Sequence, residues 1–410
     1  MQKKYILTKL VIYLISTQLI PLMHGMCIPC GVTPVVGSPY TAGIVNTYQV
    51  AFSPDSKWLA VANFGSDTVS IFSVNADTCQ LMLIGTFPTG GSNPLMAAYS
   101  PDGSCLAVSN FVTSDISIFS VNQITGAITL IGAPVPSGGF QPIGIAYSPN
   151  GTCLAVANEF DTVPFTGTGN VSIFTVNTAT CAITMLGTVI TGILNPITVD
   201  YSPNNRCLAV TNFDVSGGPG TVSIFSVDPV TCSITSIGAP VNTGDFQPTS
   251  VAYSPNGSCL AVTNSALLGT GSGSVSIFSV DSTTCSITQI GSPIATGGNK
   301  PIDLSYSPDG NCLAVVNTFS DTMMLFHVNT ETCEITPTNL IATGSFPIGV
   351  SYSPDNHCLA VANSGVNPLG VLPLPGPTGS VSIFKTTFTF AEQSPIVQAI
   401  LAKYCSVCFI

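Results

Sequence analysis

The sequence predicts an all-β fold, a seven-bladed β-propeller of four-stranded antiparallel blades, from three observations. A Ser-Pro step followed by Asp or Asn occurs seven times at intervals of 46 to 54 residues, a spacing within the range of propeller blades. The apolar runs between these steps are short and rich in Val, Ile, Thr and Phe, which favour strands. Gly and Pro interrupt every run, so little of the chain can form helices. The composition agrees, with 45% hydrophobic and only 7% charged residues.

Each repeat contains the same order of four expected strands, as the third repeat illustrates. Its inner strand covers residues 142–147, and residues 148–151 form a tight turn with proline at the position whose φ suits it. The second, third and fourth strands cover residues 153–157, 171–176 and 182–186. These runs are apolar on both faces, as expected for sheets stacked between two neighbouring sheets.

The two ends of the repeat region complement each other. After the third strand at 381–384, the last repeat has no fourth strand of the usual form. Residues 35–39 resemble the end of a fourth strand at 290–293. We therefore expect the N-terminal segment to supply the outer strand of the seventh blade, which closes the ring and removes an open sheet edge.

The chain divides into three expected parts. Residues 1–25 are typical of a signal peptide, because lysines precede an apolar run from Leu10 to Met23 that is too short to span a membrane. Cleavage would release a secreted, extracellular or periplasmic protein without stable membrane insertion, and retention as a membrane anchor is the alternative. The propeller is expected at 26–390, and residues 391–410 form a tail with a short helix and a Cys-x-x-Cys pair.

The repeat resembles a known family. The pattern Ser-Pro-Asp-Gly-x-x-Leu-x-Val-x-Asn, with Asp/Asn-x-x-Thr after the third strands, is similar to lactonase-type and YVTN-type seven-bladed propeller repeats. The resemblance extends over about residues 33 to 390 and recurs seven times in register. It implies the propeller fold but leaves the activity open, since such propellers include sugar-lactone hydrolases as well as surface and binding proteins. A WD40 propeller is disfavoured, because Trp58 is the only tryptophan and no Gly-His or Trp-Asp signature occurs.

Fifteen cysteines in an exported chain predict disulfides. Twelve recur at two repeat positions, the starts of the second and fourth strands: Cys30, Cys79, Cys105, Cys153, Cys181, Cys207, Cys232, Cys259, Cys285, Cys312, Cys333 and Cys358. Trp58 replaces the second-strand cysteine in the first repeat, and Gly126 replaces the fourth-strand cysteine in the second. Cys27, Cys405 and Cys408 remain, and with Cys30 they allow either ordinary disulfides or a four-sulfur zinc site.

Three pairing schemes can be compared. Pairing within a blade leaves Cys79 and Cys105 without partners, and pairing fourth-strand cysteines with the next blade's second strand also leaves two. Pairing each second-strand cysteine with the next blade's fourth strand leaves none, because Trp58 and Gly126 then occupy one junction together. This scheme predicts the pairs Cys105–Cys181, Cys153–Cys232, Cys207–Cys285, Cys259–Cys333, Cys312–Cys30 and Cys358–Cys79. The match of numbers is suggestive only, and buried free thiols are the alternative.

The charge excludes two classes of partner. The formal net charge is −11, with eight Lys and Arg against nineteen Asp and Glu, and three of those lysines lie in the N-terminal segment. So few cations cannot neutralise a row of phosphates, so nucleic acid is not expected as a partner, nor is an anionic membrane surface. We expect a monomer.

The candidate binding residues are departures from the repeat near the expected central channel. Most inner strands carry small residues or Met where they enter the channel, whereas the fourth and sixth repeats carry Asp200 and Asp303. Lys300 precedes Asp303 in the loop on the same face, and Glu159 follows the repeated Asn of the third blade. A carboxylate beside a narrow channel can hold a divalent cation or act as a general base. Solvated rim charges or a local Lys–Asp pair are the alternative.

No catalytic residue can be assigned from the sequence, because the body of the chain has one Arg and two His and none is expected in the channel. The preferred function is therefore a secreted or surface scaffold that binds a protein or glycan partner through the face bearing the long loops. The alternative is a lactonase-like hydrolase with a divalent cation in the central channel. A third hypothesis is a structural surface-layer component that self-associates.

Overall fold

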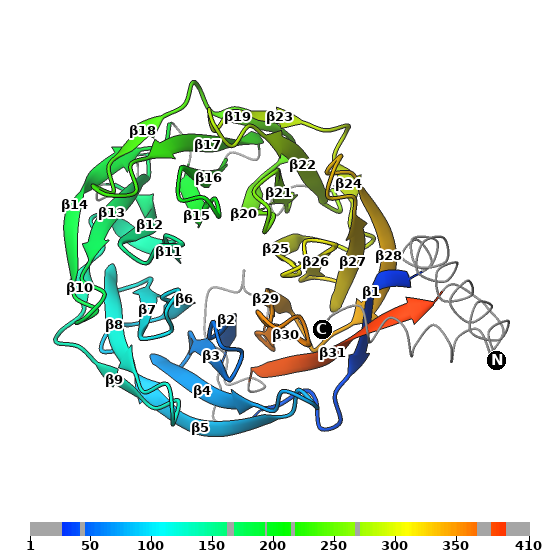
Figure 1. Ribbon diagram of the computed structural model, residues 1–410, viewed down its shortest axis with the longest axis horizontal. Coiled ribbons are helices and arrows are strands. Elements are labelled where there is room, and N and C mark those ends of the chain that lie inside the picture. The colour runs from blue at the N-terminus through cyan, green and yellow to red at the C-terminus, as the bar shows by residue number, and fades with distance from the viewer. Residues whose placement is uncertain are drawn as a thin grey trace, which may run out of the picture.

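The structure is a computed structural model that describes residues 27–41, 46–161, 168–192, 195–214, 218–266, 271–366 and 379–390. Seven antiparallel sheets are arranged in a ring around a central axis (Figure 1). The predicted all-β, seven-bladed propeller is therefore confirmed. In the first six blades the strands follow chain order from the axis outward.

The inner strands line the axis and share one irregularity. They are β2 (Thr47–Phe52), β6 (Pro94–Tyr99), β11 (Phe140–Tyr147), β15 (Asn195–Tyr201), β20 (Pro248–Tyr253), β25 (Pro301–Tyr306) and β29 (Pro347–Tyr352). In all seven, the pairing with the second strand shifts register just after the strand begins. A bulge of this kind adds a residue and turns neighbouring side chains to a new direction, here at the entrance to the channel.

The second strands form the most buried layer. They are β3 (Trp58–Asn63), β7 (Cys105–Asn110), β12 (Cys153–Phe160), β16 (Cys207–Phe213), β21 (Cys259–Asn264), β26 (Cys312–Asn317) and β30 (Cys358–Asn363). Their Leu-Ala-Val cores are inaccessible to solvent, because each sheet packs face to face with both neighbours. Each strand has a buried Asn after this core, and in the first blade Asn63 donates hydrogen bonds from its amide to the hydroxyls of Thr68 and Ser70. The repeated Asn is thus structural.

The third strands carry the largest buried side chains. They are β4 (Thr68–Val74), β8 (Asp115–Val121), β13 (Asn170–Val176), β17 (Pro219–Val227), β22 (Ser274–Val280), β27 (Thr322–Val328) and β31 (Ser380–Phe390). Each contributes one phenylalanine that is at most 2% exposed: Phe72, Phe119, Phe174, Phe225, Phe278, Phe326 and Phe384. Burying an aromatic ring once per blade supplies much of the hydrophobic free energy that holds neighbouring sheets together.

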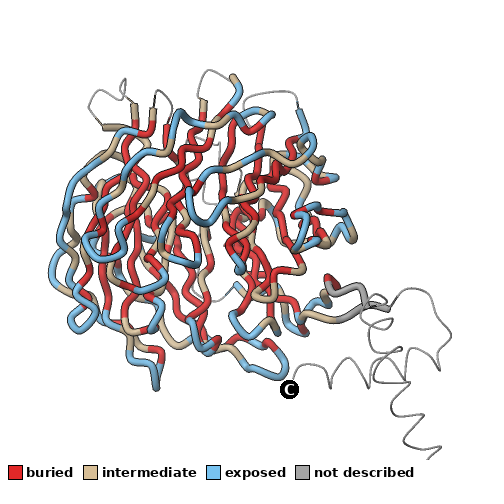
Figure 2. Tube along the Cα trace, turned by 45° about the horizontal axis from the view of Figure 1, so that its top comes forward, coloured by how far each residue is buried: buried red, intermediate tan, exposed pale blue. Residues whose placement is uncertain are grey.

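The outer position is filled in two ways. Blades 1, 3 and 6 have one continuous outer strand each: β5 (Leu81–Pro88), β14 (Ile183–Ile190) and β28 (Ile335–Ala342). Blades 2, 4 and 5 have two short strands each: β9 (Ile128–Leu130) with β10 (Val135–Pro136), β18 (Ile234–Ser236) with β19 (Val241–Phe246), and β23 (Ile287–Gln289) with β24 (Ile294–Ala295). Exposed residues gather on these outer strands and on the turns, around the buried inner layers (Figure 2).

The seventh blade is completed from the other end of the chain. β1 (Cys27–Pro34) pairs antiparallel with β31, outside β30 and β29. The two segments lie side by side at the closure of the ring (Figure 1). Val35 and Tyr40 continue this contact through backbone hydrogen bonds to Ile383 and Val381. The ring is therefore closed by strand pairing between segments some 350 residues apart in sequence.

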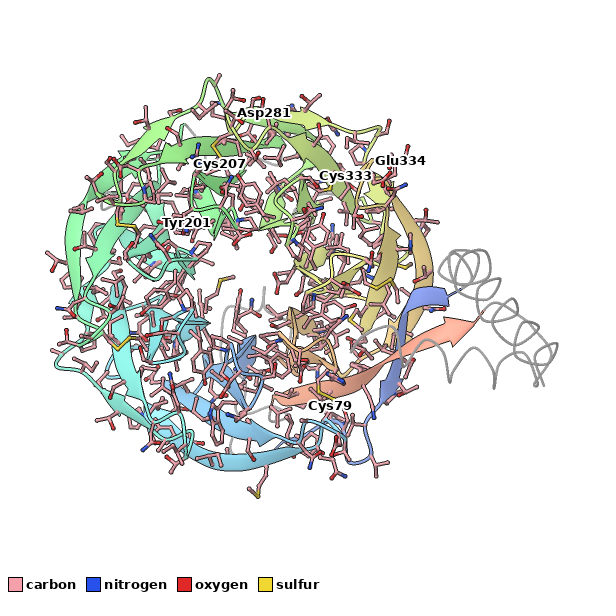
Figure 3. The ribbon with its side chains drawn as sticks, in the orientation of Figure 1. Cys79, Tyr201, Cys207, Asp281, Cys333 and Glu334 are labelled. Carbon is pink, nitrogen blue, oxygen red and sulfur yellow. A yellow bond between two sulfur atoms is a disulfide. The ribbon has the colours of Figure 1, made fainter. Side chains whose placement is uncertain are left out.

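Six disulfides join neighbouring blades around the ring, and Figure 3 labels one cysteine from each of three of them: Cys79, Cys207 and Cys333. The pairs are Cys30–Cys312, Cys79–Cys358, Cys105–Cys181, Cys153–Cys232, Cys207–Cys285 and Cys259–Cys333. Each joins the start of a second strand to the start of the next blade's outer strand or, in the seventh blade, to β1. These are the pairs of the third scheme above.

The junction between blades 1 and 2 is noncovalent. Trp58 occupies the place of one cysteine, and a Cβ placed on Gly126 would lie 2.4 Å from the indole Cε3 of Trp58. The indole therefore packs directly on the glycine, and Trp58 is only 8% exposed. Gly126 has a φ of 73°, and the equivalent cysteines of blades 1, 3, 4, 5 and 6 have φ values near 60°, a region that glycine adopts without strain. A glycine suits this backbone position where no sulfur is needed.

Two expected segments lie outside the described residues, namely the signal peptide at 1–25 and the C-terminal tail at 391–410 with Cys405 and Cys408. Cys27 begins β1, but its side chain is not among those described. In the described part of the chain, no helix has the length and apolar character required to span a bilayer.

Candidate functional site

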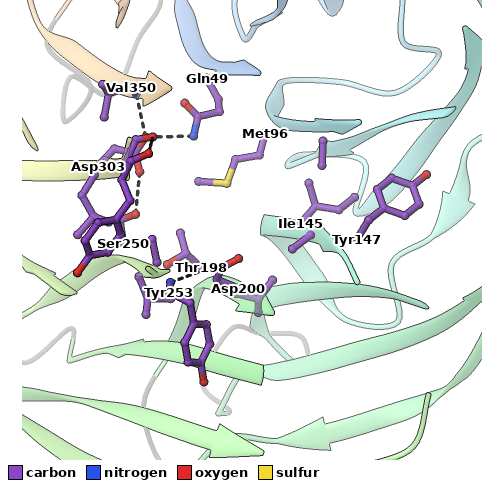
Figure 4. A pocket seen from close by; sticks show the side chains of 18 of the residues that line it. Gln49, Met96, Ile145, Tyr147, Thr198, Asp200, Ser250, Tyr253, Asp303 and Val350 are labelled. Atoms are coloured by element: carbon purple, nitrogen blue, oxygen red, sulfur yellow. Dashed lines mark hydrogen bonds between the residues drawn. The ribbon is translucent and has the colours of Figure 1, made fainter. Parts of the chain in front are cut away.

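Two cavities occupy the central channel. The mouth cavity has a volume of about 300 Å³ and lies near the starts of the inner strands, on the face that carries the connections between second and third strands (the loop face). The lower cavity has a volume of about 450 Å³ and lies toward the ends of the same strands. Gln49, Met96 and Asp303 line both cavities and form a waist between them. Figure 4 shows Met96 extending into the open space opposite Asp303.

Asp303 is the central polar group of the waist. One carboxylate oxygen accepts a hydrogen bond of 2.7 Å from the Ser250 hydroxyl, and the other accepts bonds from Gln49 Nε2 at 3.1 Å and from the Val350 amide at 2.9 Å. These three partners belong to blades 5, 1 and 7, so one side chain of blade 6 joins four blades (Figure 4). Burial raises the pKa of Asp303, and the three donors oppose that rise.

Gln49 is oriented by both ends of its amide. Its Oε1 accepts a hydrogen bond of 3.0 Å from the Val50 amide, while its Nε2 donates to Asp303. A Cβ on Gly349 would lie 1.9 Å from this Oε1, so the glycine of blade 7 leaves the space that the Gln49 side chain occupies. Gly349 is therefore required at the waist for steric reasons.

Asp200 lies in a different layer from Asp303. Asp303 stands three residues before the Tyr306 that ends its strand, whereas Asp200 stands one residue before Tyr201. The two carboxylates therefore face the channel at different depths, and Asp200 lines only the lower cavity. One of its oxygens accepts a hydrogen bond of 2.7 Å from the Tyr253 amide. Burial raises the pKa of Asp200 to about 7, partly offset by the amides of Tyr253 and Tyr201.

The raised pKa of Asp200 predicts how the stability of the fold depends on pH. Between about pH 4 and 7 the folded chain holds a proton on Asp200 that the unfolded chain releases, so the free energy of unfolding should fall as pH rises through that window. Asp200→Asn removes the contribution of Asp200 to this slope, while Asp303 and Glu159 keep theirs. The variant should be more stable than wild type at pH 8 by about 1–2 kcal/mol, a value reduced to allow for solvent in the channel. Urea unfolding at pH 4.5, 6 and 8 measures the difference.

The control for this prediction is Asp228→Asn. Asp228 is exposed, and backbone hydrogen bonds from Thr231 and Val230 lower its pKa, so its contribution lies at more acidic pH. We expect this variant to keep the wild-type slope between pH 4.5 and 8. Equal slopes in wild type and Asp200→Asn would contradict the assignment of the slope to Asp200.

Glu159 brings a carboxylate to the mouth cavity. It lies at the end of β12, past the repeated Asn158, and it is half-buried among mostly apolar lining residues. Burial raises the pKa of Glu159, and the Asn195 side chain lowers it by a smaller amount. The amide nitrogen of Asn195 is buried and Asn195 does not line the cavity, so its side chain acts on Glu159 rather than on a ligand.

Tyr48 also lines the mouth cavity. Burial and the charge of Glu159 raise the pKa of Tyr48 to about 12, so its phenol keeps its proton across the neutral range. The ring is supported by Phe64, with centroids 5.9 Å apart. Sequence reasoning missed Tyr48 and Asn195. Tyr48 is a visible departure, because the other inner strands carry an aliphatic residue or Thr at its position.

Lys300 lies at the loop face, but its ammonium group is directed to backbone. It donates to the carbonyl oxygens of Ala266 and Gly271, the latter at 3.2 Å, and burial lowers its pKa. Asp303, the nearby carboxylate in the sequence, accepts hydrogen bonds from three other blades. The structure thus brings Glu159 and Asp303 to one cavity, places Asp200 in the other, and does not place Lys300 in the lining of either.

A divalent cation in the channel would need several oxygen, nitrogen or sulfur ligands from nearby side chains. Among the described residues, no three His, Cys, Asp or Glu side chains gather closely enough to hold a metal ion. Asp303 already accepts three hydrogen bonds, and Asp200 lies in another layer. The described channel therefore does not fit the divalent cation site considered from the sequence, and we derive no chemical step through one.

Comparisons with known proteins identify the family. The family model described as "Lactonase, 7-bladed beta-propeller" matches residues 37–143 and 233–350, more than half of the chain. A search of curated proteins finds no match.

Solved structures show the same fold. A proposed 6-phosphogluconolactonase of Bacteroides uniformis matches with a TM-score of 0.63 at 18% identity over 73% of this chain and 86% of that chain. The periplasmic gluconolactonase of Pseudomonas aeruginosa matches at 0.59 and 18% over 73% and 86%. A chain of Kuenenia stuttgartiensis hydrazine synthase matches at 0.62 and 19% over 87% and 100%. Since functions this different share the architecture, these likenesses show the fold alone.

Proposed function

We propose a lactonase function for this chain, which belongs to the seven-bladed lactonase propeller family. The family match corrects the function preferred from the sequence. The scaffold that binds a protein or glycan partner through its loop face is wrong as the main interpretation, because the family match favours the lactonase-like alternative. Glu159 was predicted as a candidate beside the channel, but the apolar cavity around it is formed by residues from several blades and was not predicted.

We propose that the protein hydrolyses a lactone in the mouth cavity, with Glu159 as the general base. The observation that carries this proposal is the Glu159 carboxylate in a mostly apolar cavity that is also lined by Tyr48. A general base works best when its pKa lies near the working pH, and burial moves the pKa of Glu159 in that direction.

The proposed reaction uses only residues of this chain and one water molecule. Glu159 takes a proton from water as the water oxygen bonds to the lactone carbonyl carbon, and the carbonyl electron pair moves to oxygen. The Tyr48 side chain lines the cavity, and its hydroxyl is a donor available to the resulting oxyanion. Collapse of the tetrahedral intermediate breaks the ring C–O bond, and the leaving alkoxide takes the proton from Glu159. The product is the open hydroxy acid.

The compartment is part of the proposal. The six disulfides fit an oxidising environment. We propose that the chain acts outside the cytoplasm, as a secreted or periplasmic protein whose signal segment is removed. N-terminal sequencing of the mature protein would test the removal.

The test of function is hydrolysis of a small lactone panel by the purified oxidised protein. Glu159→Gln should lower kcat/KM by about 10²–10⁴-fold, the range for loss of a general base. The control Glu331→Gln changes an exposed Glu on a hairpin and should retain wild-type rates. EDTA should leave the rate unchanged, since no described cluster of donors holds a metal ion.

The pH profile gives a second readout. Glu159 must be ionised to act, so kcat/KM should fall as pH decreases through its pKa, which burial places above the ordinary value of about 4.3. No hydrolysis of any lactone, or equal rates for Glu159→Gln and wild type, would refute the proposed function.

A further inference from the structure

The described lining of the mouth cavity has acidic side chains but no basic ones. It includes Glu159 and Asp303, and no Lys or Arg. Lys57, Arg206 and Lys385 lie in or beside turns at the opposite ends of the strands. The internal segments outside the described residues, at 42–45, 162–167, 193–194, 215–217, 267–270 and 367–378, contain no Lys or Arg in their sequences. Lys300 donates to loop carbonyls.

Most of the cavity wall is aliphatic or aromatic. Beyond the residues already placed there, the lining consists of Ile143, Ile197, Ile302, Ile348, Phe213 and Thr249. The isoleucines come from four different blades, and each follows the proline near the start of its inner strand, within the register shift. The seven-fold bulge therefore lines the entrance with a collar of apolar side chains.

The polar groups of the wall are largely committed to the protein. The Gln49 amide is held by Val50 and Asp303, and the Thr249 hydroxyl interacts with Thr263 and with the Pro301 carbonyl. Groups left for a ligand are therefore the Glu159 carboxylate and the Tyr48 hydroxyl. Two groups suffice for one ester function, but they do not satisfy the hydroxyls of a sugar as well.

We propose that the substrate of this site is a neutral lactone with an apolar substituent, and that phosphorylated sugar lactones are excluded. This inference rests on the proposed lactone hydrolysis. A phosphate dianion would lose its hydration beside two carboxylates without a cation to replace it. An apolar ring would instead displace water from the isoleucine collar, a gain of about 0.8 kcal/mol for each buried CH₂. A cavity of about 300 Å³ admits one ring compound of modest size.

The experiment compares three lactones with the full-length oxidised protein. They are dihydrocoumarin, which is neutral and apolar, glucono-δ-lactone, which is neutral and polar, and 6-phosphogluconolactone, which is anionic. We expect kcat/KM for dihydrocoumarin to exceed that for 6-phosphogluconolactone by at least about 100-fold. Equal rates, or preference for the phosphorylated substrate, would overturn the inference while leaving lactone hydrolysis supported.

A charge added to the collar gives a sharper test. Ile302→Lys places an ammonium group in a partly exposed position of the mouth and should raise kcat/KM for 6-phosphogluconolactone while lowering it for dihydrocoumarin. The matched control Ile124→Lys adds the same charge at a site that is 89% exposed, away from the channel, and should change neither value. Unchanged selectivity in Ile302→Lys would contradict the assignment of the substrate site.

Binding separates the two proposals if no lactone is hydrolysed. The lactam analogue of dihydrocoumarin resists ester hydrolysis but keeps the ring and carbonyl. Its binding by calorimetry, weakened at least about 10-fold in Ile302→Lys, would support an apolar ligand site even as the proposed catalysis failed. Absence of lactam binding together with absence of turnover would refute both.

Discussion

Reduction of the six disulfides is expected to lower Tm by more than about 10 °C while leaving the β-sheet content unchanged at 25 °C. Four of the bridges join residues 74 to 79 positions apart, and two join residues about 280 apart. In the chain-entropy account, loss of one bridge of the shorter kind costs about 2–5 kcal/mol. The loops overlap, so the six effects should add to less than their sum. Thermal unfolding followed by circular dichroism, with and without dithiothreitol, measures the change.

The blade 1–2 junction supplies the control for this prediction. Cys153→Ser with Cys232→Ser should lower the free energy of unfolding by about 2–5 kcal/mol. Trp58→Cys with Gly126→Cys introduces a bridge at the one junction that lacks it, and mass spectrometry should detect the new pair. In the oxidised wild type, hydrogen exchange should be fastest at the interface between β3 and the turn at Gly126, and reduction should remove the difference between junctions. Free thiols at the twelve paired positions in the oxidised protein would contradict the bridged ring.

Much of the fold was predictable because the chain repeats one unit seven times. A repeat places equivalent residues at equivalent points in space, so a cysteine register can be compared between blades without coordinates. Trp58 and Gly126 coincide at one junction for this reason. The closing strand was also recognisable, because residues 35–39 resemble the end of another outer strand.

The site was less predictable because it forms where seven different strands converge. Asp200 and Asp303 both face the channel, but their depths differ by two residues along the strand, and the sequence analysis treated them as one layer. Glu159 was recognised as a charge beside the channel, while its apolar surroundings depend on isoleucines from several blades. The role of Asn195 was invisible in sequence, since it follows from the position of its side chain beside Glu159.

Asp303→Ala is expected to destabilise the ring by about 3–5 kcal/mol, because it removes the acceptor shared by three donors at a site only 6% exposed. Gln49 Nε2, the Ser250 hydroxyl and the Val350 amide would be left unpaired. Ser305→Ala is the matched control, since Ser305 also faces the channel but in the lower cavity, and its loss should cost less than about 1 kcal/mol. Urea unfolding of both variants measures the difference.

A double-mutant cycle tests whether Asp303 acts through its contacts. Gln49→Ala and Asp303→Asn should show a coupling energy of about 0.5–3 kcal/mol, as expected for residues in direct contact. Additive effects within about 0.5 kcal/mol would show that the two side chains stabilise the ring independently.

The same variants connect the waist to substrate binding. Tyr48, Ile302 and Ile348 directly precede Gln49, Asp303 and Gly349 along their strands, so the hydrogen bonds of the waist hold part of the mouth wall in place. Glu159 lies on β12 in blade 3, whereas the hydrogen bonds of Asp303 given above connect it to blades 1, 5 and 7. Asp303→Asn should therefore raise KM for an apolar lactone several-fold and change kcat less. A fall in kcat with KM unchanged would instead place Asp303 among the groups that act on the transition state.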